Sequence, residues 1–211
     1  MPTVTDRRRR VGLLGGSFNP AHEGHLHISR LALDRLGLDE LWWLVSPQNP
    51  LKSDSDMAPA AVRLAGARAV ARDSRIAVTD IERELGTRYT VDTVAALQDR
   101  FPDHRFVWIA GADILAEMHR WKDWRRLFRR VAIAVFARPT YSFRALSSIA
   151  ARRFAAHRAS ESAARRVVGR RLPAWVFLRT PVHPASATAI RKARAQAARG
   201  DVARVVRPRT E

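Results

Sequence analysis

The chain of 211 residues contains no cysteine. A disulfide framework and a thiolate metal site are therefore excluded, and a reducing compartment is compatible with the composition. The sequence also lacks any apolar run that approaches the roughly 20 residues of a membrane-spanning helix. The length corresponds to one ordinary domain with its own core. We therefore expect a cytoplasmic protein with no membrane partner.

Two common nucleotide-binding patterns are missing as well. The chain has no G-x-x-x-x-G-K-[ST] string, which excludes a P-loop kinase or ATPase. Gly12, Gly15 and Gly16 do not form G-x-G-x-x-G, and no acidic residue follows at the distance that would hold a ribose. A nicotinamide-dependent dehydrogenase is therefore not expected.

Positive charge is abundant but confined to a few segments. Of the net charge of +18, residues 1–10 carry +3, residues 142–172 carry +7 and residues 191–211 carry +5. A basic stripe for nucleic acid is one interpretation, but no helix-turn-helix, zinc-finger or RRM pattern accompanies it. An arginine-rich solvated surface is the simpler interpretation, so a nucleic-acid partner is not expected.

The ends of the chain are interpreted as accessory segments. Arg7 to Arg10 before an apolar run superficially suggest a signal peptide or twin-arginine export tag, but the run is short and broken by glycine, so export is not expected. We expect residues 1–10 to be a flexible basic leader and residues 201–211 a C-terminal tail. The domain then covers residues 11–200, with residues 142–172 as a helical insertion that could cover the sheet or contact another subunit.

Residues 15–25, Gly-Gly-Ser-Phe-Asn-Pro-Ala-His-Glu-Gly-His, are the most informative stretch of the sequence. They lie between a short apolar run and a stretch with helical periodicity, so they predict a strand, a tight turn and a helix. Such a turn lets the backbone approach an anion, and the helix start offers unpaired N–H groups and a positive dipole end. His22 and His25 stand where a phosphate would lie.

A second motif lies near the C-terminus, where residues 186–191 are Ser-Ala-Thr-Ala-Ile-Arg. Ser186 can cap the helix that follows, which places Thr188 and Arg191 in its first turns. The guanidinium of Arg191 can bind two phosphate oxygens at once, which a lysine cannot do.

Strand and helix patterns alternate along the chain. Near-continuous apolar runs predict strands that are buried on both faces, hence a parallel sheet. Strands are expected at 11–15, 40–46, 76–80, 105–110, 131–137 and 174–179. Helices are expected at 24–36, 59–72, 90–100, 112–130 with a break near Trp121, 145–171 and 187–199. The fold class is α/β, a single-domain Rossmann-like doubly wound parallel sheet, with ligands at the carboxyl ends of the strands.

His22-Glu23-Gly24-His25 resembles the H-x-G-H signature of the nucleotidyltransferase superfamily, and residues 186–191 resemble its I-S-S-T-x-I-R signature. Three further segments resemble the nicotinate-nucleotide adenylyltransferases within it. They are residues 47–52, similar to a P-x-x-P-x-K-type loop; residues 88–93, similar to Y-T-x-D-T; and residues 111–115 with Trp121 and Trp124, similar to G-A-D-x-L…W. The resemblance covers about residues 11–200.

The resemblance implies adenylyl transfer from ATP to nicotinate mononucleotide, giving deamido-NAD and pyrophosphate. The implied catalytic residues are His22, His25 and Arg191. The implied ATP-binding residues are Gly15, Gly16, Ser17, Phe18, His22, His25, Lys52, Arg138, Ser186, Thr188 and Arg191. The implied nicotinate mononucleotide-binding residues are Asn19, Lys52, Tyr89, Thr90, Asp113 and Trp121. Mg²⁺ is expected to arrive with ATP, with no protein metal site, and a homo-oligomer is left open.

The sequence departs from the family patterns at Ala185 and Ala187, which replace an aliphatic residue and a second serine, and at Lys122, where relatives often have tyrosine. One phosphate contact and one base contact are therefore in question. Three alternatives stay open: another adenylyltransferase of the superfamily such as the pantetheine-phosphate type, a basic nucleic-acid-binding protein, and a sensor that binds ATP without turnover. Trp124 is expected in the core and His27 as a surface or packing histidine.

Overall fold

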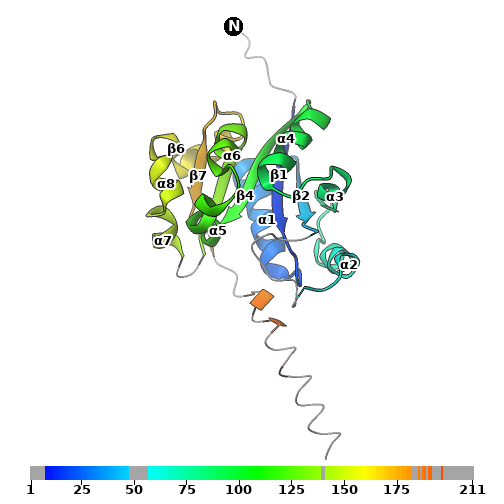
Figure 1. The fold of residues 1–211 in the computed structure, drawn as a ribbon. Helices are drawn as coiled ribbons and strands as arrows, with labels where there is room; N and C mark the ends of the chain where they lie inside the picture. Colours follow the sequence, from blue (N-terminus) through cyan, green and yellow to red (C-terminus); the bar gives the residue numbers. More distant parts are fainter. Residues whose placement is uncertain are drawn as a thin grey trace, which may run out of the picture.

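The computed structural model describes residues 8–47, 57–138 and 141–181, together with 185, 187–188, 190–191 and 196. Within these residues, seven strands form one sheet in the order β3-β2-β1-β4-β5-β7-β6, and all neighbouring strands are parallel (Figure 1). The strands are β1 (Arg9–Gly16), β2 (Glu40–Val45), β3 (Ile76–Thr79), β4 (His104–Gly111), β5 (Ala132–Phe136), β6 (Arg158–Ala159) and β7 (Trp175–Leu178).

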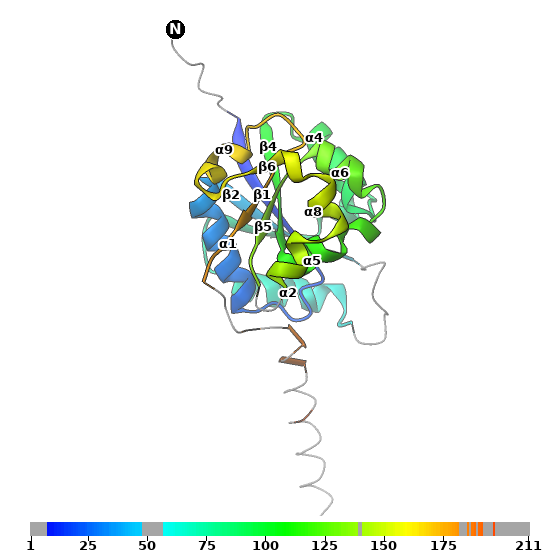
Figure 2. The ribbon, with the colours of Figure 1, turned by 90° about the vertical axis from the view of Figure 1, so that its left-hand side faces the viewer.

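Helices cover both faces of the sheet. The described helices are α1 (Glu23–Leu36), α2 (Ala60–Val70), α3 (Ile81–Glu84), α4 (Thr90–Arg100), α5 (Ala112–Glu117), α6 (Trp124–Arg130), α7 (Ser142–Leu146), α8 (Ile149–Arg153) and α9 (Ala164–Val167), with single 3₁₀ turns η2 (Met118–Arg120), η3 (Ala155–His157) and η4 (Glu161–Ala163). Buried residues of α1, α2 and α9 belong to one apolar cluster, and those of α4, α5, α6 and α8 belong to another. Figure 2 shows α1 and α9 on one side of the sheet, with α5, α6 and α8 on the other.

The strand order confirms the doubly wound α/β class. From β1 the chain proceeds through β2 to β3 on one side, and then returns to place β4 on the other side of β1. Ligands of open α/β sheets bind at such a switch point, outside the carboxyl ends of the strands. The turn after β1 and the turn after β4 therefore meet at the position where a site is expected.

All six expected strands are present, with ends displaced by at most two residues. The central runs are buried on both faces, as in β5, where every residue is buried. Four of the expected helices are also confirmed as α1, α2, α4 and the interrupted 112–130 segment. The predicted break near Trp121 is real, because α5 ends at Glu117 and α6 begins at Trp124.

The expected continuous helix over residues 145–171 is wrong. That segment holds four short helical pieces, α8, η3, η4 and α9, after the end of α7, and it contributes the edge strand β6. Ser148 starts a new helix by accepting from the Ala151 N–H at 3.2 Å. Trp175 donates from Nε1 to the Phe154 carbonyl at 2.8 Å, and the Phe154 ring stacks on Phe128 with centroids 4.3 Å apart. These tertiary contacts override the helical propensity of an Ala/Arg-rich stretch.

The expected leader (residues 1–10) and tail (residues 201–211) lie largely or wholly outside the described residues, and so does most of the expected helix at 187–199. Of that helix, residues 187, 188, 190, 191 and 196 are described, and they are helical. In the described part of the chain, no helix has the length and apolar character that crossing a membrane requires.

Candidate active site

The turn that follows β1 lies at the carboxyl edge of the sheet. Ser46, directly after β2, donates its N–H to the Gly16 carbonyl at 2.9 Å, which holds the two strand ends together. Phe18 has a φ of 46°, in the left-handed region that residues other than glycine rarely adopt. Its ring is 2% exposed and stacks on Trp43 with centroids 5.0 Å apart. Packing thus holds a strained turn, and such turns cluster at functional sites.

His22 and His25 form a reciprocal cap at the start of α1. His22 is the N-cap residue, and its Nδ1 accepts from the Gly24 N–H at 3.1 Å. The Nδ1 of His25 accepts from the His22 N–H at 3.2 Å, and the two ring centroids are 3.9 Å apart. A neutral imidazole that accepts at Nδ1 carries its proton on Nε2. The cap therefore sets both rings in the tautomer that donates from Nε2.

The surroundings of His25 disfavour its protonated form. Burial, and then the proximity of His22 and Arg138, lowers the pKa of His25 from 6.5 to about 3. His25 is therefore neutral near pH 7 and can donate a hydrogen bond without carrying a charge. Positive charge near His25 comes from Arg138 instead.

Gly24 allows two close approaches at once. A Cβ added there would lie 2.9 Å from the His22 Nδ1 and 3.1 Å from the main-chain oxygen of Ala185. The first contact belongs to the cap, and the second is with the C-terminal segment, which comes within reach of α1. Glycine at this motif position thus serves both the cap and the docking of that segment.

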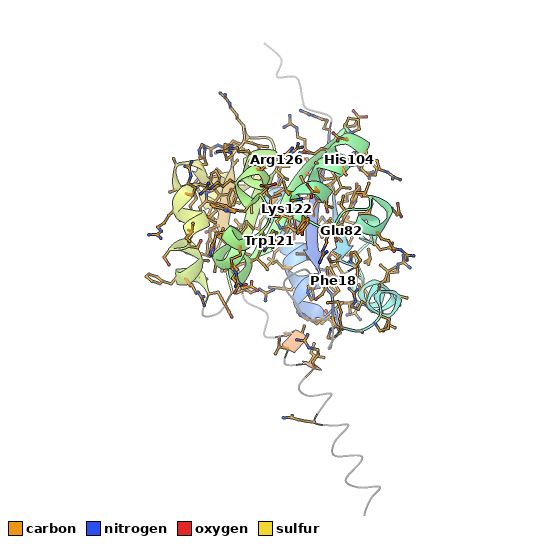
Figure 3. All side chains as sticks on the ribbon, in the orientation of Figure 1. Phe18, Glu82, His104, Trp121, Lys122 and Arg126 are labelled. Carbon is orange, nitrogen blue, oxygen red and sulfur yellow. The ribbon has the colours of Figure 1, made fainter. Side chains whose placement is uncertain are left out.

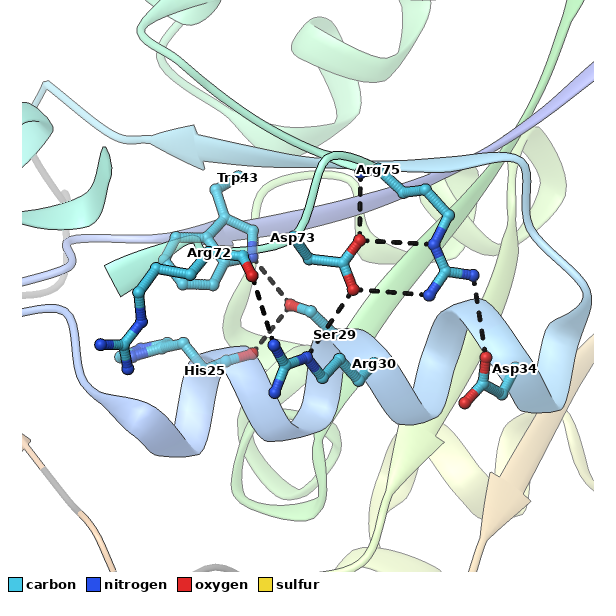
Figure 4. Close-up of polar contacts among 8 residues, drawn as sticks. All are labelled: His25, Ser29, Arg30, Asp34, Trp43, Arg72, Asp73 and Arg75. Carbon is cyan, nitrogen blue, oxygen red and sulfur yellow. Dashed lines mark hydrogen bonds and ion pairs between the residues drawn. The ribbon is translucent and has the colours of Figure 1, made fainter. Parts of the chain in front are cut away.

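A buried hydrogen-bond chain fixes α1 against the sheet (Figure 4). Ser29, which is 0% exposed, donates from Oγ to the His25 carbonyl and accepts from the Trp43 Nε1, both at 2.8 Å. Arg30 pairs with Asp73, in the turn before β3, with Nε and Oδ2 3.7 Å apart. These contacts set the depth of the His25 ring relative to β2.

The C-terminal motif reaches the first motif. Arg191 donates from Nη1 to the Asn19 carbonyl at 2.7 Å, and its Nη2 lies 3.4 Å from the Thr188 Oγ1. The side chain of Asn19 accepts in turn from the Ala58 N–H at 3.3 Å. Thr188 and Arg191 are both exposed, and their roles at the phosphates stay a prediction.

The end of β4 brings together two residues to which the family resemblance gave separate roles. Asp113, in the first turn of α5, pairs with Arg138, which follows β5, with Oδ1 and Nε 3.2 Å apart. That Oδ1 is buried and accepts no hydrogen bond within the described residues. A Cβ on Gly111 would lie 2.4 Å from this oxygen and 2.6 Å from the Arg138 Nε. Glycine at 111 therefore makes room for the pair.

The first turn of α4 forms another side of the same edge. Tyr89 is the N-cap residue and Thr90 begins the helix. The Lys122 ammonium lies 4.5 Å from the Tyr89 ring centroid and 3.1 Å from the Asp92 Oδ2 (Figure 3 labels Lys122). The family position often occupied by tyrosine thus holds a cation beside the α4 terminus.

The two tryptophans of the G-A-D-x-L…W segment differ in their surroundings. Trp121 is half-buried and meets Trp108 edge to face, with centroids 6.2 Å apart. Trp124 packs edge to face against Phe128 and Phe154, which belong to the core. The expectation that Trp124 packs in the core agrees with these contacts, and the role of Trp121 stays a prediction. His27 contacts the Pro181 carbonyl through Nε2 at 2.8 Å.

Lys52 and Ser186, expected at the phosphates, lie outside the described residues. Gly15, Gly16, Ser17 and Phe18 lie in or directly after β1. In the part of the chain that the structure describes, no three His, Asp or Glu side chains gather where a metal ion could be held.

Three buried polar residues at this edge were missed by the sequence interpretation. They are Arg63 in α2, Glu82 in α3 and Thr93 in α4, with exposed fractions of 3%, 7% and 0%. For Arg63 and Glu82 the only sequence signal is a charged residue on the apolar face of a short helix, whereas Thr93 is the last residue of the Y-T-x-D-T-like segment, which was given no role of its own. That signal is weak, because a single arginine in such a helix usually extends its charge to solvent.

The chain matches the family model described as cytidylyltransferase-like over residues 13–193. It is 54% identical over 183 residues to the Parvibaculum lavamentivorans protein named "Probable nicotinate-nucleotide adenylyltransferase", covering 87% of this chain and 91% of that one. A Caulobacter sp. (strain K31) protein of the same name is 52% identical over 182 residues, covering 86% and 96%. The chain belongs to the nicotinate-nucleotide adenylyltransferases of the cytidylyltransferase-like family.

Solved structures agree with the fold of this family. The Plasmodium falciparum nicotinic acid mononucleotide adenylyltransferase complexed with NaAD superposes with a TM-score of 0.65, covering 87% of this chain and 83% of that one. Sequence identity between the two is 16%, so the likeness supports the shared fold of the nucleotidyltransferase and nothing finer.

Proposed function

We propose that this chain transfers the adenylyl group of ATP to nicotinate mononucleotide. A phosphate oxygen of the mononucleotide attacks the α-phosphorus of ATP, the new P–O bond forms, and the bond from the α-phosphorus to the bridging oxygen breaks. Pyrophosphate leaves with that electron pair, and the dinucleotide deamido-NAD is formed. Because negative charge meets negative charge, positioning and electrostatic stabilisation account for the catalysis.

The single observation that carries the proposal is the capped histidine pair at the carboxyl end of β1. Both rings are set to donate from Nε2, and His25 does so while neutral at pH 7. The positive dipole end of α1 also favours an anion at this position. Pre-arranged donors of this kind stabilise charge that develops in a phosphoryl transition state.

The triphosphate would lie between the two motifs. His22 and His25 contact the reacting phosphate, and the main chain of Gly15, Gly16, Ser17 and Phe18 lies beside it. Arg191 and Thr188, with Ser186, hold the β- and γ-phosphates. Arg138 and Lys52 add positive charge. The contact of Arg191 with the Asn19 carbonyl supports this placement, since it brings the guanidinium to the turn that the phosphates would touch.

The acceptor mononucleotide would lie between the ends of α4 and α5. Thr90 and the main chain near Tyr89 bind the nicotinate carboxylate, and Trp121 stacks on the pyridine ring. Asn19 and Lys52 approach its phosphate. Asp113 binds a ribose hydroxyl; its buried Oδ1, which accepts no hydrogen bond within the described residues, supports this role.

A divalent ion such as Mg²⁺ would enter with ATP and neutralise phosphate charge. The described residues offer no cluster of three metal-binding side chains, and Asp113 is already paired with Arg138. In this proposal phosphate oxygens and water hold the ion.

The test is pyrophosphate release by the purified protein with Mg-ATP and one of three acceptors: nicotinate mononucleotide, nicotinamide mononucleotide or phosphopantetheine. We expect a strong preference for the first acceptor. Turnover of another acceptor alone would keep the phosphate chemistry but overturn the assignment of Tyr89, Thr90 and Trp121. ATP binding without pyrophosphate release from any acceptor would support a sensor instead.

A further inference from the structure

Arg63 joins three separate segments at the carboxyl edge of the sheet. Its guanidinium donates from Nη1 to the carbonyls of Ser17 at 2.7 Å and Ser46 at 2.8 Å, and from Nη2 to the Pro47 carbonyl at 3.0 Å. Nε donates to the Ala58 carbonyl at 2.9 Å. Burial lowers the pKa of Arg63 from its usual value. A buried cation that binds four carbonyls fixes the distance between the turn after β1 and the residues after β2.

Glu82 continues the network from Ser46. Its carboxylate accepts a hydrogen bond from the Ser46 side chain, and its Oε1 accepts another from the Thr93 Oγ1 at 3.1 Å. Glu82 belongs to α3 and is labelled in Figure 3. Burial raises the pKa of this carboxyl group, because its ionised form is poorly solvated there.

Thr93 carries the network to the first turn of α4. Its Oγ1 lies 3.2 Å from the Tyr89 carbonyl and 2.9 Å from the Thr87 Oγ1. Tyr89 is the N-cap residue of α4, where the proposed pyridine pocket begins. The polar path thus starts at the phosphate-binding turn and ends at the acceptor pocket. Its members in order are Ser17, Arg63, Ser46, Glu82, Thr93 and Tyr89.

We propose that Arg63, Glu82 and Thr93 are positioning residues that hold the phosphate-binding turn and the first turn of α4 at the separation which adenylyl transfer requires. This inference rests on the proposed function above. In this arrangement none of the three touches substrate. Arg63 acts through the main chain of Ser17, Thr93 acts through that of Tyr89, and Glu82 links the two by way of Ser46. A reaction between two bound nucleotides depends steeply on the distance between them, and a shift of about 1 Å can cost on the order of a hundredfold in rate.

Stability alone does not account for such a network. Burying charged and polar groups carries a desolvation penalty, and a well-packed apolar core of the same volume is often as stable or more so. Hydrogen bonds differ from apolar contacts because they set direction and a separation near 3 Å. The arrangement therefore contributes a defined geometry between two sites.

The primary test compares Thr93→Val with Thr93→Ser. Valine keeps the shape of threonine but removes the hydroxyl, whereas serine keeps the hydroxyl. We expect Thr93→Val to lower kcat by about tenfold or more with the KM values for ATP and nicotinate mononucleotide changed by less than about threefold, as misplacement of bound substrates predicts. Thr93→Ser should retain kcat within about threefold.

The matched control is Gln98→Met in the same helix. Gln98 donates from Nε2 to the Arg130 carbonyl at 2.7 Å, so this variant also removes one tertiary hydrogen bond of α4, but one that leads away from the site. Its kcat should equal that of the wild type. An equal fall of kcat in Gln98→Met and Thr93→Val would show that kcat responds to any loss of a tertiary hydrogen bond of α4. That result would overturn the inference.

A second pair makes the same test at Glu82. Glu82→Gln keeps an acceptor for Thr93 and an amide for Ser46, and should retain activity, while Glu82→Met should lose kcat as Thr93→Val does. If Thr93→Val fails to fold, the comparison of Glu82→Gln with Glu82→Met tests the positioning role by itself. Wild-type kcat in folded Thr93→Val and Glu82→Met would overturn the positioning role and leave the proposed function intact. A wild-type protein that makes no pyrophosphate from the two substrates would instead overturn the proposed function.

Discussion

Arg191 donates from Nη1 to the main-chain oxygen of Asn19 at 2.7 Å, although 172 positions separate the two residues in the sequence. The contact joins the C-terminal motif to the turn after β1. Glycine at position 24 also allows this contact between the two segments, because a Cβ there would lie 3.1 Å from the main-chain oxygen of Ala185. Two motifs at opposite ends of the domain are thus brought into contact.

Replacing Arg191 with alanine should lower kcat/KM at least tenfold, which corresponds to about 1.4 kcal/mol of transition-state stabilisation. The substitution would remove the guanidinium N–H groups that donate to phosphate. Because Arg191 is exposed, it should not disturb the core. Arg191→Lys should recover only part of the activity, because an ammonium cannot bind two oxygens in one plane. Arg68→Ala, at an exposed position of α2, is the control and should be fully active. Unchanged kcat/KM in Arg191→Ala would remove this residue from the site.

His25 should make the protein sensitive to acid. Its pKa is about 3 in the folded chain and 6.5 as the ordinary value, so between these pH values the unfolded chain binds a proton that the folded chain does not. The free energy of unfolding should therefore fall as pH drops from about 6.5 toward 3, by up to about 1.4 kcal/mol per pH unit from this group. His25→Asn should lose less stability than the wild type between pH 7 and pH 4.5 in urea titrations. Parallel losses in the two proteins would contradict the burial of a neutral ring.

Gly111→Ala should disturb the Asp113–Arg138 pair, because the new Cβ would lie 2.4 Å from the Asp113 Oδ1. We expect a loss of about tenfold or more in kcat/KM for nicotinate mononucleotide, as displaced binding groups predict. Gly66→Ala is the matched control, since nothing lies within 4 Å of its added Cβ. It should keep full activity and raise stability by about 0.5–1 kcal/mol, as expected for alanine in a helix interior. Equal activity of the two variants would rule out a constraint at Gly111.

Lys122 should favour an acceptor with a negative charge. Its ammonium pairs with Asp92 and lies over the Tyr89 ring, so Lys122→Met would leave the Asp92 carboxylate uncompensated beside the pocket. We expect the ratio of kcat/KM for nicotinate over nicotinamide mononucleotide to fall about threefold or more, while folding stability changes by less than about 1 kcal/mol, as for an exposed pair. Lys122→Arg should keep the ratio, and Asp92→Asn combined with Lys122→Met should largely restore it. An unaltered ratio in Lys122→Met would show that the pair has no part in substrate choice.

The sequence by itself determined the fold class and the motifs. Apolar runs such as residues 132–136 are long enough and regular enough to predict buried parallel strands without knowledge of their neighbours. The helix α1 is expected from residue 24 and begins at Glu23, but its cap by His22 is not predicted, because histidine is not among the usual N-cap residues. Family patterns near His25, Tyr89 and Asp113 indicated nucleotide chemistry because each pattern is contiguous in the chain.

Only the tertiary structure decided the rest. The Ala/Arg-rich segment after α7 is helical by propensity, but packing of Phe154 on Phe128 and the Trp175 hydrogen bond break it into short pieces with an edge strand. The low pKa of His25 depends on burial and on Arg138, which is distant in sequence. The path through Arg63, Glu82 and Thr93 joins residues from three helices. Such contacts depend on how helices pack on the sheet, and no local pattern in the sequence encodes that packing.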